Sequence, residues 1–388
     1  MIEFSANTRR RAVDAAPFSP AATGLVRRVH AMVPGGGSTA LRALPSLAER
    51  LGVRAVLVKD ESTRFGLKAF KGLGGVYAMF RMICEALGLD PAGATLEALR
   101  RPPFAGRVRE MHFATTTDGN HGKGVSWAAG VFGCRAHVFM PKGSVEARAQ
   151  AIRDAGNAEV TVTDMAYDDC VAWTAEQARR EGWRLIQDTS WPGYEQVPLW
   201  IMQGYTTLLF EALDQMGRMG LGRPTHLLLQ AGVGAMAGAI AGAALETCDP
   251  APVVATVESA GVACFRESFR AGDGLPHRAT GSGETIMAGL NCAVPCTVAW
   301  DLLGGCAAGG FACSDDVTER GMRLLADAGV VSGESGAVTT GLADALADPE
   351  NRPARDALGL DRDSVLLLIS TEGDTDPENY RRITARRG

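Results

Sequence analysis

The hydrophobic positions of this chain form short apolar runs separated by longer segments in which apolar residues recur at helical spacing. The short runs are rich in Val, Leu and Ile and end in glycine or polar turns, a pattern typical of buried strands. The expected strands cover residues 53–59, 110–116, 135–140, 159–163, 184–187, 225–230, 253–258 and 365–370. The expected helices cover residues 40–51, 71–87, 122–132, 144–155, 168–181, 204–215 and 236–245, after an irregular polar segment at residues 1–30.

Strands alternate with helices along most of the chain, and many of the strands are apolar throughout. Such strands are buried on both faces, which indicates parallel sheets covered by helices on either side. The pattern therefore predicts an α/β fold with two doubly wound domains and mainly parallel sheets. Ligands in such folds bind beyond the carboxyl ends of the strands.

Length and composition are those of an ordinary globular enzyme. The chain has 388 residues and a net charge of −5, so it lacks the basic field that nucleic-acid binding requires. Residues 225–245 are the most apolar stretch, but glycines and Gln230 favour strand, loop and helix over a membrane span. The nine cysteines include no CxxC pair, which favours a reducing cytoplasm, and we expect no metal site.

The segment Ala69–Gly75 reads AFKGLGG, so Lys71 stands between apolar residues and three glycines. Each glycine weakens a helix interior by about 1 kcal/mol relative to alanine, so these glycines indicate close packing or approach to a ligand. An amine in a partly dry site has a lowered pKa and attacks carbonyl groups. Lys71 therefore suits the Schiff base that holds pyridoxal phosphate, although a surface lysine beside a helix start is the ordinary alternative and Lys68 is a rival amine.

The segment Gln230–Gly238 reads QAGVGAMAG and directly follows an apolar strand. Its glycines let the backbone approach an anion, and the positive end of the following helix points at the loop, which suits a phosphate monoester. Close packing of strand on helix selects the same small residues, so both interpretations stay open. A dinucleotide site would need different glycine spacing, with Glu258 as the candidate ribose partner.

The segment Thr115–Gly124 reads TTTDGNHGKG and again joins a strand to a helix through a glycine turn. Backbone amides of this turn could hold a substrate carboxylate, and Asn120 could donate to a phenolate oxygen. Asp118 suits general-base work if it is desolvated, or it could cap the following helix.

The segment Ile369–Asp376 reads ISTEGDTD, and Ser370 or Thr371 could partner a ring nitrogen beyond the strand. A hydroxyl cannot keep a pyridine nitrogen protonated as a carboxylate would, so the ring is a weaker electron sink, which favours β-elimination over transamination. An ordinary polar turn is the alternative.

Two further segments carry candidate polar groups. Asp188, Trp191 and Tyr194 follow a strand, where an acidic group would suit a cationic substrate side chain; a turn with packing aromatics is the alternative. Glu334, at the start of an expected helix in SGESGA, could face the pocket or only cap the helix.

Together these segments resemble the fold-type II pyridoxal phosphate enzymes, which are tryptophan synthase beta-like, and most closely the 2,3-diaminopropionate ammonia-lyase family. The resemblance runs over nearly the whole chain and includes RFGLKAFKGLGG, ATTTDGNHGKGVSWAA, QDTSWPGYEQVPLWIMQGY, GVGAMAG, IMAGLNC, SGESGA and STEGDTD. Near residue 40 the chain departs from the family, with Ser-Thr-Ala-Leu after three glycines.

The resemblance implies a role for each matching residue. Lys71 would form the Schiff base and act as base for the L-substrate, Asp118 would be the base for the D-substrate, and Asp188 would recognise or help the leaving β-amino group. Cofactor contacts are expected from Phe70, Lys71, Asn120, Gly232, Val233, Gly234, Ala235, Met236, Ser370 and Thr371. Substrate contacts are expected from Thr116, Thr117, Asp118, Gly119, Asp188 and Tyr194.

The implied reaction is the elimination of ammonia from D- and L-2,3-diaminopropionate, which yields pyruvate and two ammonia molecules. A serine/threonine or hydroxyaspartate dehydratase of the same fold is the first alternative. A non-catalytic protein of this fold and an NAD-dependent enzyme are the others.

The resemblance also implies a cytoplasmic homodimer that acts on a small amino acid. Its large domain, residues 1–75 and 201–388, would anchor the cofactor, and its small mobile domain would cover residues 76–200. Cys264 and Cys292 are expected near the entrance of the site.

Overall fold

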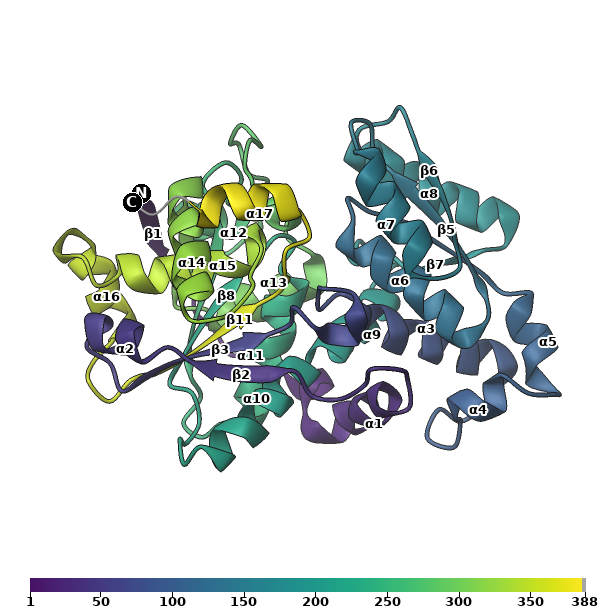
Figure 1. Ribbon diagram of the computed structural model, residues 1–388, viewed down its shortest axis with the longest axis horizontal. Helices are drawn as coiled ribbons and strands as arrows, with labels where there is room; N and C mark the ends of the chain where they lie inside the picture. The colour runs from purple at the N-terminus through teal and green to yellow at the C-terminus, as the bar shows by residue number, and fades with distance from the viewer. Residues whose placement is uncertain (386–388) are drawn as a thin grey trace. The chain divides into compact units, whose positions relative to one another are not determined.

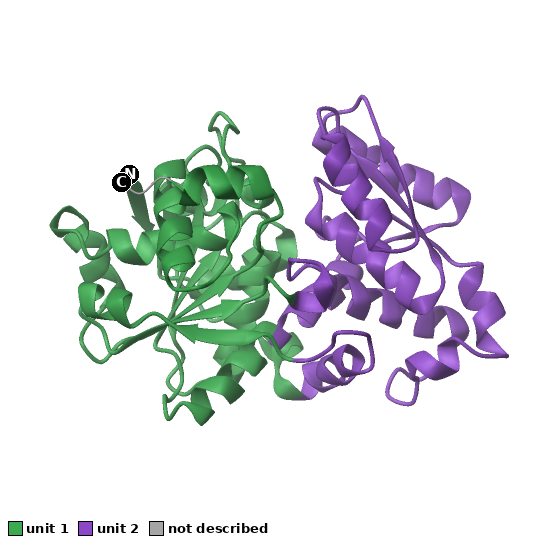
Figure 2. Cartoon of the chain, viewed as in Figure 1, with its two compact units in different colours: residues 1–20, 38–63, 208–388 green, residues 21–37, 64–207 purple. Residues whose placement is uncertain are grey.

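The structure, a computed structural model, describes residues 1–385, which form two compact units (Figure 2). Unit 1 comprises residues 1–20, 38–63 and the described chain from 208 onward, and unit 2 comprises residues 21–37 and 64–207. Each unit contains its own sheet.

Unit 1 is built on a seven-stranded sheet in the order β1-β10-β9-β8-β11-β3-β2 (Figure 1). The edge strands β1 and β2 pair antiparallel with their neighbours, and every other pairing is parallel. The strands are β1 (Ile2–Ala6), β2 (Ala40–Ala43), β3 (Ala55–Asp60), β8 (His226–Gln230), β9 (Val253–Ser259), β10 (Gly309–Cys313) and β11 (Val365–Ser370).

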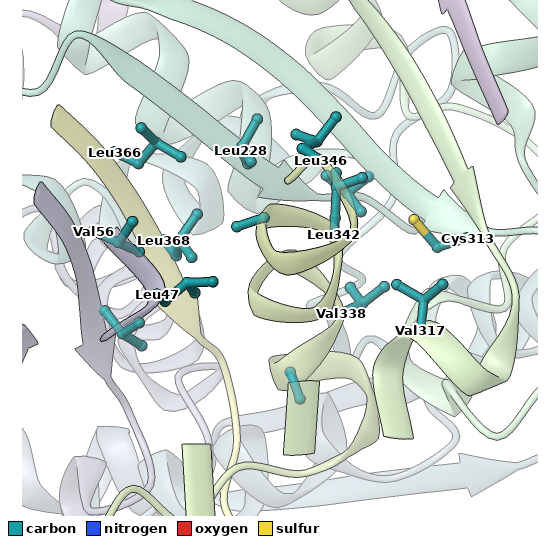
Figure 3. Packing of buried hydrophobic residues seen from close by; sticks show 14 of the residues in the cluster. Leu47, Val56, Leu228, Cys313, Val317, Val338, Leu342, Leu346, Leu366 and Leu368 are labelled. Atoms are coloured by element: carbon teal, nitrogen blue, oxygen red, sulfur yellow. The ribbon is translucent and has the colours of Figure 1, made fainter. Parts of the chain in front are cut away.

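Helices of unit 1 pack their apolar faces against this sheet. Leu228 of β8 and Leu366 and Leu368 of β11 belong to one buried cluster with Leu342 and Leu346 of α15 (Figure 3). Each such side chain contributes roughly 1.5–3 kcal/mol by burial. The helices are α2 (Pro45–Leu51), α10 (Thr207–Arg218), α11 (Ala235–Thr247), α12 (Cys264–Ala271), α13 (Thr297–Cys306), α14 (Asp315–Asp327), α15 (Glu334–Ala345), α16 (Arg352–Leu358) and α17 (Pro377–Thr384).

Unit 2 contains a four-stranded sheet in the order β6-β5-β4-β7, in which every pairing is parallel. Its strands are β4 (His112–Thr116), β5 (Arg135–Met140), β6 (Ala158–Val162) and β7 (Arg184–Leu185). Its helices are α1 (Pro20–Ala31), α3 (Gly72–Leu87), α4 (Leu96–Leu99), α5 (Phe104–Arg109), α6 (Asn120–Phe132), α7 (Glu146–Ala155), α8 (Tyr167–Glu181) and α9 (Gln196–Tyr205). The two mainly parallel sheets confirm the predicted α/β class, and no helix of the described chain is long and apolar enough to span a bilayer.

Glycines bring the start of α3 into backbone contact with α6 and α9. A Cβ at Gly124 of α6 would lie 3.0 Å from the Cα of Gly72 and 3.1 Å from the carbonyl carbon of Lys71. A Cβ at Gly204 of α9 would lie 2.6 Å from the carbonyl oxygen of Leu73. The glycines after Lys71 therefore serve close helix packing, one of the two purposes that the sequence indicated.

Some elements differ from those that the sequence predicted. Residues 1–30 are not irregular, because they include β1 and most of α1. The expected helix at 40–51 is wrong over Ala40–Ala43, which pair with β3; the helix begins only at Pro45, whose fixed φ suits the first turn. The elements from α12 through α14, together with α16 and α17, were not predicted at all.

The boundaries of the two units also differ from those expected for the two domains. Residues 21–37, 64–75 and 201–207 group with unit 2, although all of them were assigned to the large domain. Lys71 consequently belongs to unit 2.

We predict that Gly124→Ala destabilises the protein by about 1–3 kcal/mol, because the added methyl group must displace backbone atoms of α3. The matched control is Gly106→Ala in α5, where a Cβ would meet no atom within 4 Å. That change is expected to be neutral or to stabilise by up to about 1 kcal/mol. Denaturant unfolding measures both, and equal stability of the two variants would contradict the close packing.

Candidate functional site

Lys71 and Asp188 form an ion pair within unit 2. Lys71 directly precedes α3, and its Nζ donates to Oδ2 of Asp188 over 2.5 Å. The side chains are only 21% and 11% exposed, so the pair is partly dry. The rival Lys68 is exposed and has a positive φ of 58°. Of the two lysines, Lys71 is therefore the one in a partly buried setting.

The charges around Asp188 keep this carboxylate ionised. Burial alone would raise its pKa, but attraction from His121 and from Lys71, with the hydrogen bond from Lys71, lowers the pKa of Asp188 to about 2. Asp188 is thus an anion across the whole physiological pH range and can bind a cationic group.

His121 is a third member of this group, and the sequence analysis assigned it no role. It is the second residue of α6, and its Nε2 lies 2.8 Å from the carbonyl oxygen of Ile186. Its Nδ1 faces Oδ2 of Asp188 at 3.7 Å. Burial lowers the pKa of His121, and Asp188 acts in the opposite direction. The only signal in the sequence was its place within TTTDGNHGKG.

Two aromatic residues lie close to the ion pair. The rings of Phe70 and Tyr205 are 4.8 Å apart, and Lys71 Nζ is 5.5 Å from the centre of the Phe70 ring. Tyr205 is fully buried, and burial raises the pKa of its hydroxyl. Phe70 was expected at the site, whereas Tyr205 was not.

Asp118 does not cap α6. The oxygen that caps it is Oγ1 of Thr117, which accepts from the amides of Gly119 at 3.0 Å and Gly122 at 3.1 Å. Asp118 is exposed in the turn. Its pKa is raised by partial desolvation and by repulsion from Asp188, and attraction from Arg148 lowers it by a smaller amount. A carboxylate with a raised pKa is suited to accept a proton. Asn120, the expected partner of the ring oxygen, is the first residue of α6.

Thr116 and Tyr194 use their polar groups inside unit 2. Thr116 donates its hydroxyl to Thr174 at 2.8 Å, and the side-chain amide of Gln187 bonds both its N–H, at 2.9 Å, and its carbonyl, at 3.1 Å. The hydroxyl of Tyr194 accepts from the amide of Gln187 and donates to the carbonyl of Leu185. These bonds stabilise the segment that leads to Asp188, and the expected substrate contacts of Thr116, Thr117, Gly119 and Tyr194 stay predictions.

The ring of Tyr194 has a structural role as well. It stacks on Trp191 with 4.5 Å between ring centres. Trp191 and Tyr194 are therefore packing aromatic residues of a turn, the alternative given for them in the sequence.

The glycine loop Ala231–Gly234 of unit 1 joins β8 to α11. Gly234 has a φ of 89°, and a Cβ there would lie 2.3 Å from the ring of Phe265. A Cβ at Gly232 would lie 3.0 Å from the carbonyl oxygen of Gly289. Val233 follows Gly232, and Ala235 and Met236 are the first two residues of α11, whose amides are directed to this loop. Gly234 therefore has to be a glycine, Gly232 leaves little space for a side chain, and the loop suits a phosphate group.

Ser370 ends β11 beside this loop. Its hydroxyl donates to Oγ of Ser332 over 2.7 Å, and Thr371 follows it, also buried. Gln230 at the end of β8 donates to the carbonyl of Ile369 over 2.7 Å. The glycine loop and Ser370 thus lie at the carboxyl ends of the neighbouring strands β8 and β11, the edge that parallel sheets use for ligands.

The acidic residues of unit 1 near these strand ends are occupied. Glu372 accepts from the amide of Ser335 at 3.1 Å, and Glu334 accepts from the side chain of Asn379. Glu258 accepts from the amides of Phe265 and Arg266 at 2.8 and 2.7 Å. Glu258 is therefore committed to the start of α12, which disfavours the dinucleotide alternative.

Cys264 and Cys292 both lie against Gly232. The Sγ of Cys264 is 3.7 Å from the carbonyl oxygen of Gly232, and Sγ of Cys292 would be 3.1 Å from a Cβ at that glycine. Both cysteines thus lie beside the glycine loop, and their place near the entrance of the site stays a prediction.

Comparison with known proteins gives consistent relatives. The chain is 45% identical over 373 residues to the diaminopropionate ammonia-lyase of Escherichia coli (strain K12), which covers 94% of this chain and 92% of that protein. The crystal structure of the Escherichia coli enzyme in complex with D-serine has a TM-score of 0.91 and 43% identity, and covers 99% of this chain and 97% of that chain. A second structure of that enzyme, in complex with an aminoacrylate-PLP azomethine reaction intermediate, has a TM-score of 0.89 and 42% identity, with coverage of 99% and 97%.

The match to a whole family settles the class of the chain. Residues 32–369 match the family described as pyridoxal-phosphate dependent enzyme, a span that holds Lys71, the glycine loop and most of both sheets. The residues at the ends of β8 and β11 fit such a cofactor, and the structures of the relatives share the fold. This chain belongs to the pyridoxal-phosphate dependent enzymes, in their fold-type II branch.

Proposed function

We propose that this enzyme eliminates ammonia from D- and L-2,3-diaminopropionate and yields pyruvate and two ammonia molecules. The observation that carries the proposal is the ion pair between Lys71 and Asp188, a carboxylate whose pKa is lowered to about 2 by His121 and Lys71. A buried carboxylate suits a substrate whose β-substituent is a cation, whereas a hydroxyl substituent would gain less from it. The extensive identity to diaminopropionate ammonia-lyases supports the same substrate.

The residues present fit pyridoxal phosphate. The amides of Gly232, Val233 and Gly234, with the N-terminus of α11, would hold the phosphate. The hydroxyl of Ser370 or Thr371 would partner the ring nitrogen, and Asn120 the ring oxygen. When bound, the cofactor draws electrons from the α-carbon of the substrate, so that the proton on this carbon becomes removable.

Three side chains would move or hold the protons and charges of the reaction. Lys71 Nζ would accept the α-proton of the L-isomer, and the carboxylate of Asp118 would accept that of the D-isomer on the opposite face. Asp188 would bind the β-ammonium group, which leaves as ammonia with the electrons of its bond to carbon. The raised pKa of Asp118 supports its role as a base.

The cellular setting is proposed on more general grounds. The cysteines of the described residues form no disulfide, which supports a reducing cytoplasm. The family resemblance supports a homodimer. The separate compact unit 2, which contains Lys71, is proposed to be the mobile part of each subunit.

The substrate is tested with a panel of D- and L-diaminopropionate and D- and L-serine, with pyruvate as the measured product. We expect both diaminopropionate isomers to be turned over faster than either serine isomer. A wide preference for serine would instead establish the alternative of a serine dehydratase.

Lys71→Ala is expected to abolish turnover of both isomers, with a loss of at least about 10³-fold, because the reactive amine is removed. The variant should also lose the visible absorbance band that borohydride bleaches in the unchanged enzyme. Lys68→Ala is the matched control, since Lys68 is exposed three positions away, and it should keep both the band and the activity. Equal losses in the two variants would refute the assignment.

Asp118→Asn is expected to reduce kcat/KM for the D-isomer by about 10²–10⁴-fold, the usual contribution of a general base. Turnover of the L-isomer, measured on the same preparation, is the internal control and should change by less than about 10-fold. Similar losses for both isomers would contradict the use of two bases.

A further inference from the structure

Two nitrogen atoms, from Lys71 and from His121, face the same oxygen of Asp188. Its Oδ2 accepts from Lys71 Nζ at 2.5 Å and lies 3.7 Å from Nδ1 of His121. His121 is only 4% exposed, and within the described residues its Nδ1 makes no hydrogen bond. The group therefore contains a buried nitrogen that faces a carboxylate across a short gap.

The other ring nitrogen fixes where the proton of His121 is. Nε2 lies 2.8 Å from the carbonyl oxygen of Ile186, and a carbonyl can only accept, so Nε2 carries the proton. In the neutral ring, Nδ1 therefore presents a lone pair to Asp188. The lone pair of Nδ1 and the carboxylate oxygen repel each other. A proton bound to Nδ1 would turn this repulsion into attraction, so Nδ1 can accept one proton.

The charges around His121 link that position to Lys71. The groups that face it are Asp188 from the segment after β7 and Lys71 from the start of α3, while Asp118 and Tyr205 act on this pair. Burial lowers the pKa of His121, the Lys71 ammonium lowers it further, and Asp188 raises it. Loss of the positive charge on Lys71 must therefore increase the affinity of His121 for a proton.

We infer that Lys71, Asp188 and His121 form a proton relay in which His121 holds the proton that Lys71 gives up. The Nζ–H bond of Lys71 breaks and its electron pair stays on Nζ; the proton passes to Oδ2 of Asp188 and from there to Nδ1 of His121. Asp188 is again a carboxylate, now paired with an imidazolium. The inference rests on the proposal that Lys71 is the amine that reacts with the cofactor.

The relay is feasible in this geometry. The first step runs along an existing hydrogen bond of 2.5 Å. For the second, the 3.7 Å gap must shorten by about 0.5 Å to reach hydrogen-bond distance, which a small side-chain rotation provides. The result is a neutral, nucleophilic amine whose proton stays inside the protein, and a buried carboxylate that never lacks a counter-ion. Because His121 acts through Asp188, it is a positioning residue.

The decisive experiment removes the charge of Lys71 and observes His121 directly. The chain has six histidines, so ¹⁵N-histidine labelling gives a small spectrum in which the signal of His121 is identified by its loss in His121→Gln. In full-length Lys71→Met, measured with and without pyridoxal phosphate, we expect the titration midpoint of His121 to rise by at least about one pH unit. In Lys71→Met/Asp188→Asn the midpoint should fall back.

If His121 keeps its neutral form with the proton on Nε2 in Lys71→Met at every pH tested, the relay is refuted. This measurement does not depend on turnover. Failure of the substrate panel with a clear rise of the midpoint would leave the relay intact and reject only the proposed substrate.

A second measurement follows capture of the cofactor. In His121→Gln the amide can still donate to Ile186, but no group takes the proton from Asp188. We expect the pH at which cofactor-free protein captures pyridoxal phosphate at half its maximal rate to rise by about one unit, because Lys71 must lose its proton to solvent. His277→Gln, on an exposed histidine of unit 1, is the control and should leave this pH unchanged. An unchanged pH in His121→Gln would also overturn the relay.

Discussion

The close crossing of α3 with α6 at Gly72 and Gly124 is the constraint on which the group of Lys71, Asp188 and His121 depends. No side chain separates the two helices there, so the residues at their N-terminal ends are brought within reach of the same carboxylate. Lys71 lies at the end of α3 and His121 at the end of α6. Asp188 follows β7 in the chain, and a bulkier residue at Gly124 would push α6 away from the start of α3.

Unit 1 positions its own polar groups by a different principle. Its parallel strands end at one edge, so chemistry can be supplied by whichever residue follows each strand. β8 is followed by the glycine loop Ala231–Gly234 with its backbone amides, and β11 ends at the hydroxyl of Ser370. The nearby carboxylate of Glu372 is held by a backbone amide. The ring nitrogen of a bound cofactor would thus meet a neutral partner, which agrees with a lyase rather than a transaminase.

Much of the fold could be predicted because its strands are apolar and branched, as in Val365–Ser370. Prediction failed where local composition hid the tertiary role. β10 begins with Gly309 and Gly310, residues of low strand propensity that fit here because Arg266 and Thr256 pack directly on Gly310. Ala40–Ala43 has helical spacing but is recruited by the edge of β3.

The site shows the same division. Lys71, Asp118 and Asp188 could be proposed as site residues from the sequence, because their segments resemble a family as well as carrying reactive groups. The grouping of His121 with Lys71 and Asp188 could not be predicted, since it arises only when three distant segments meet. Tyr194 illustrates the opposite case: nothing in its local sequence reveals that its hydroxyl is consumed by the backbone of Leu185 and Gln187.

The side chain of Gln187 has a consequence for how accurately Asp188 is placed. Its amide bonds the N–H and the carbonyl of Thr116, so it imitates a peptide group and adds one rung to the ladder after the two-residue strand β7 has ended. The main chain therefore leaves the sheet before Gln187, while the side chain of Gln187 keeps this segment beside Thr116 of β4. Asp188 therefore lies in a turn, yet its position is fixed by the hydrogen bonds of the preceding residue to β4. Any insertion between Leu185 and Asp188 would shift Asp188 relative to these bonds.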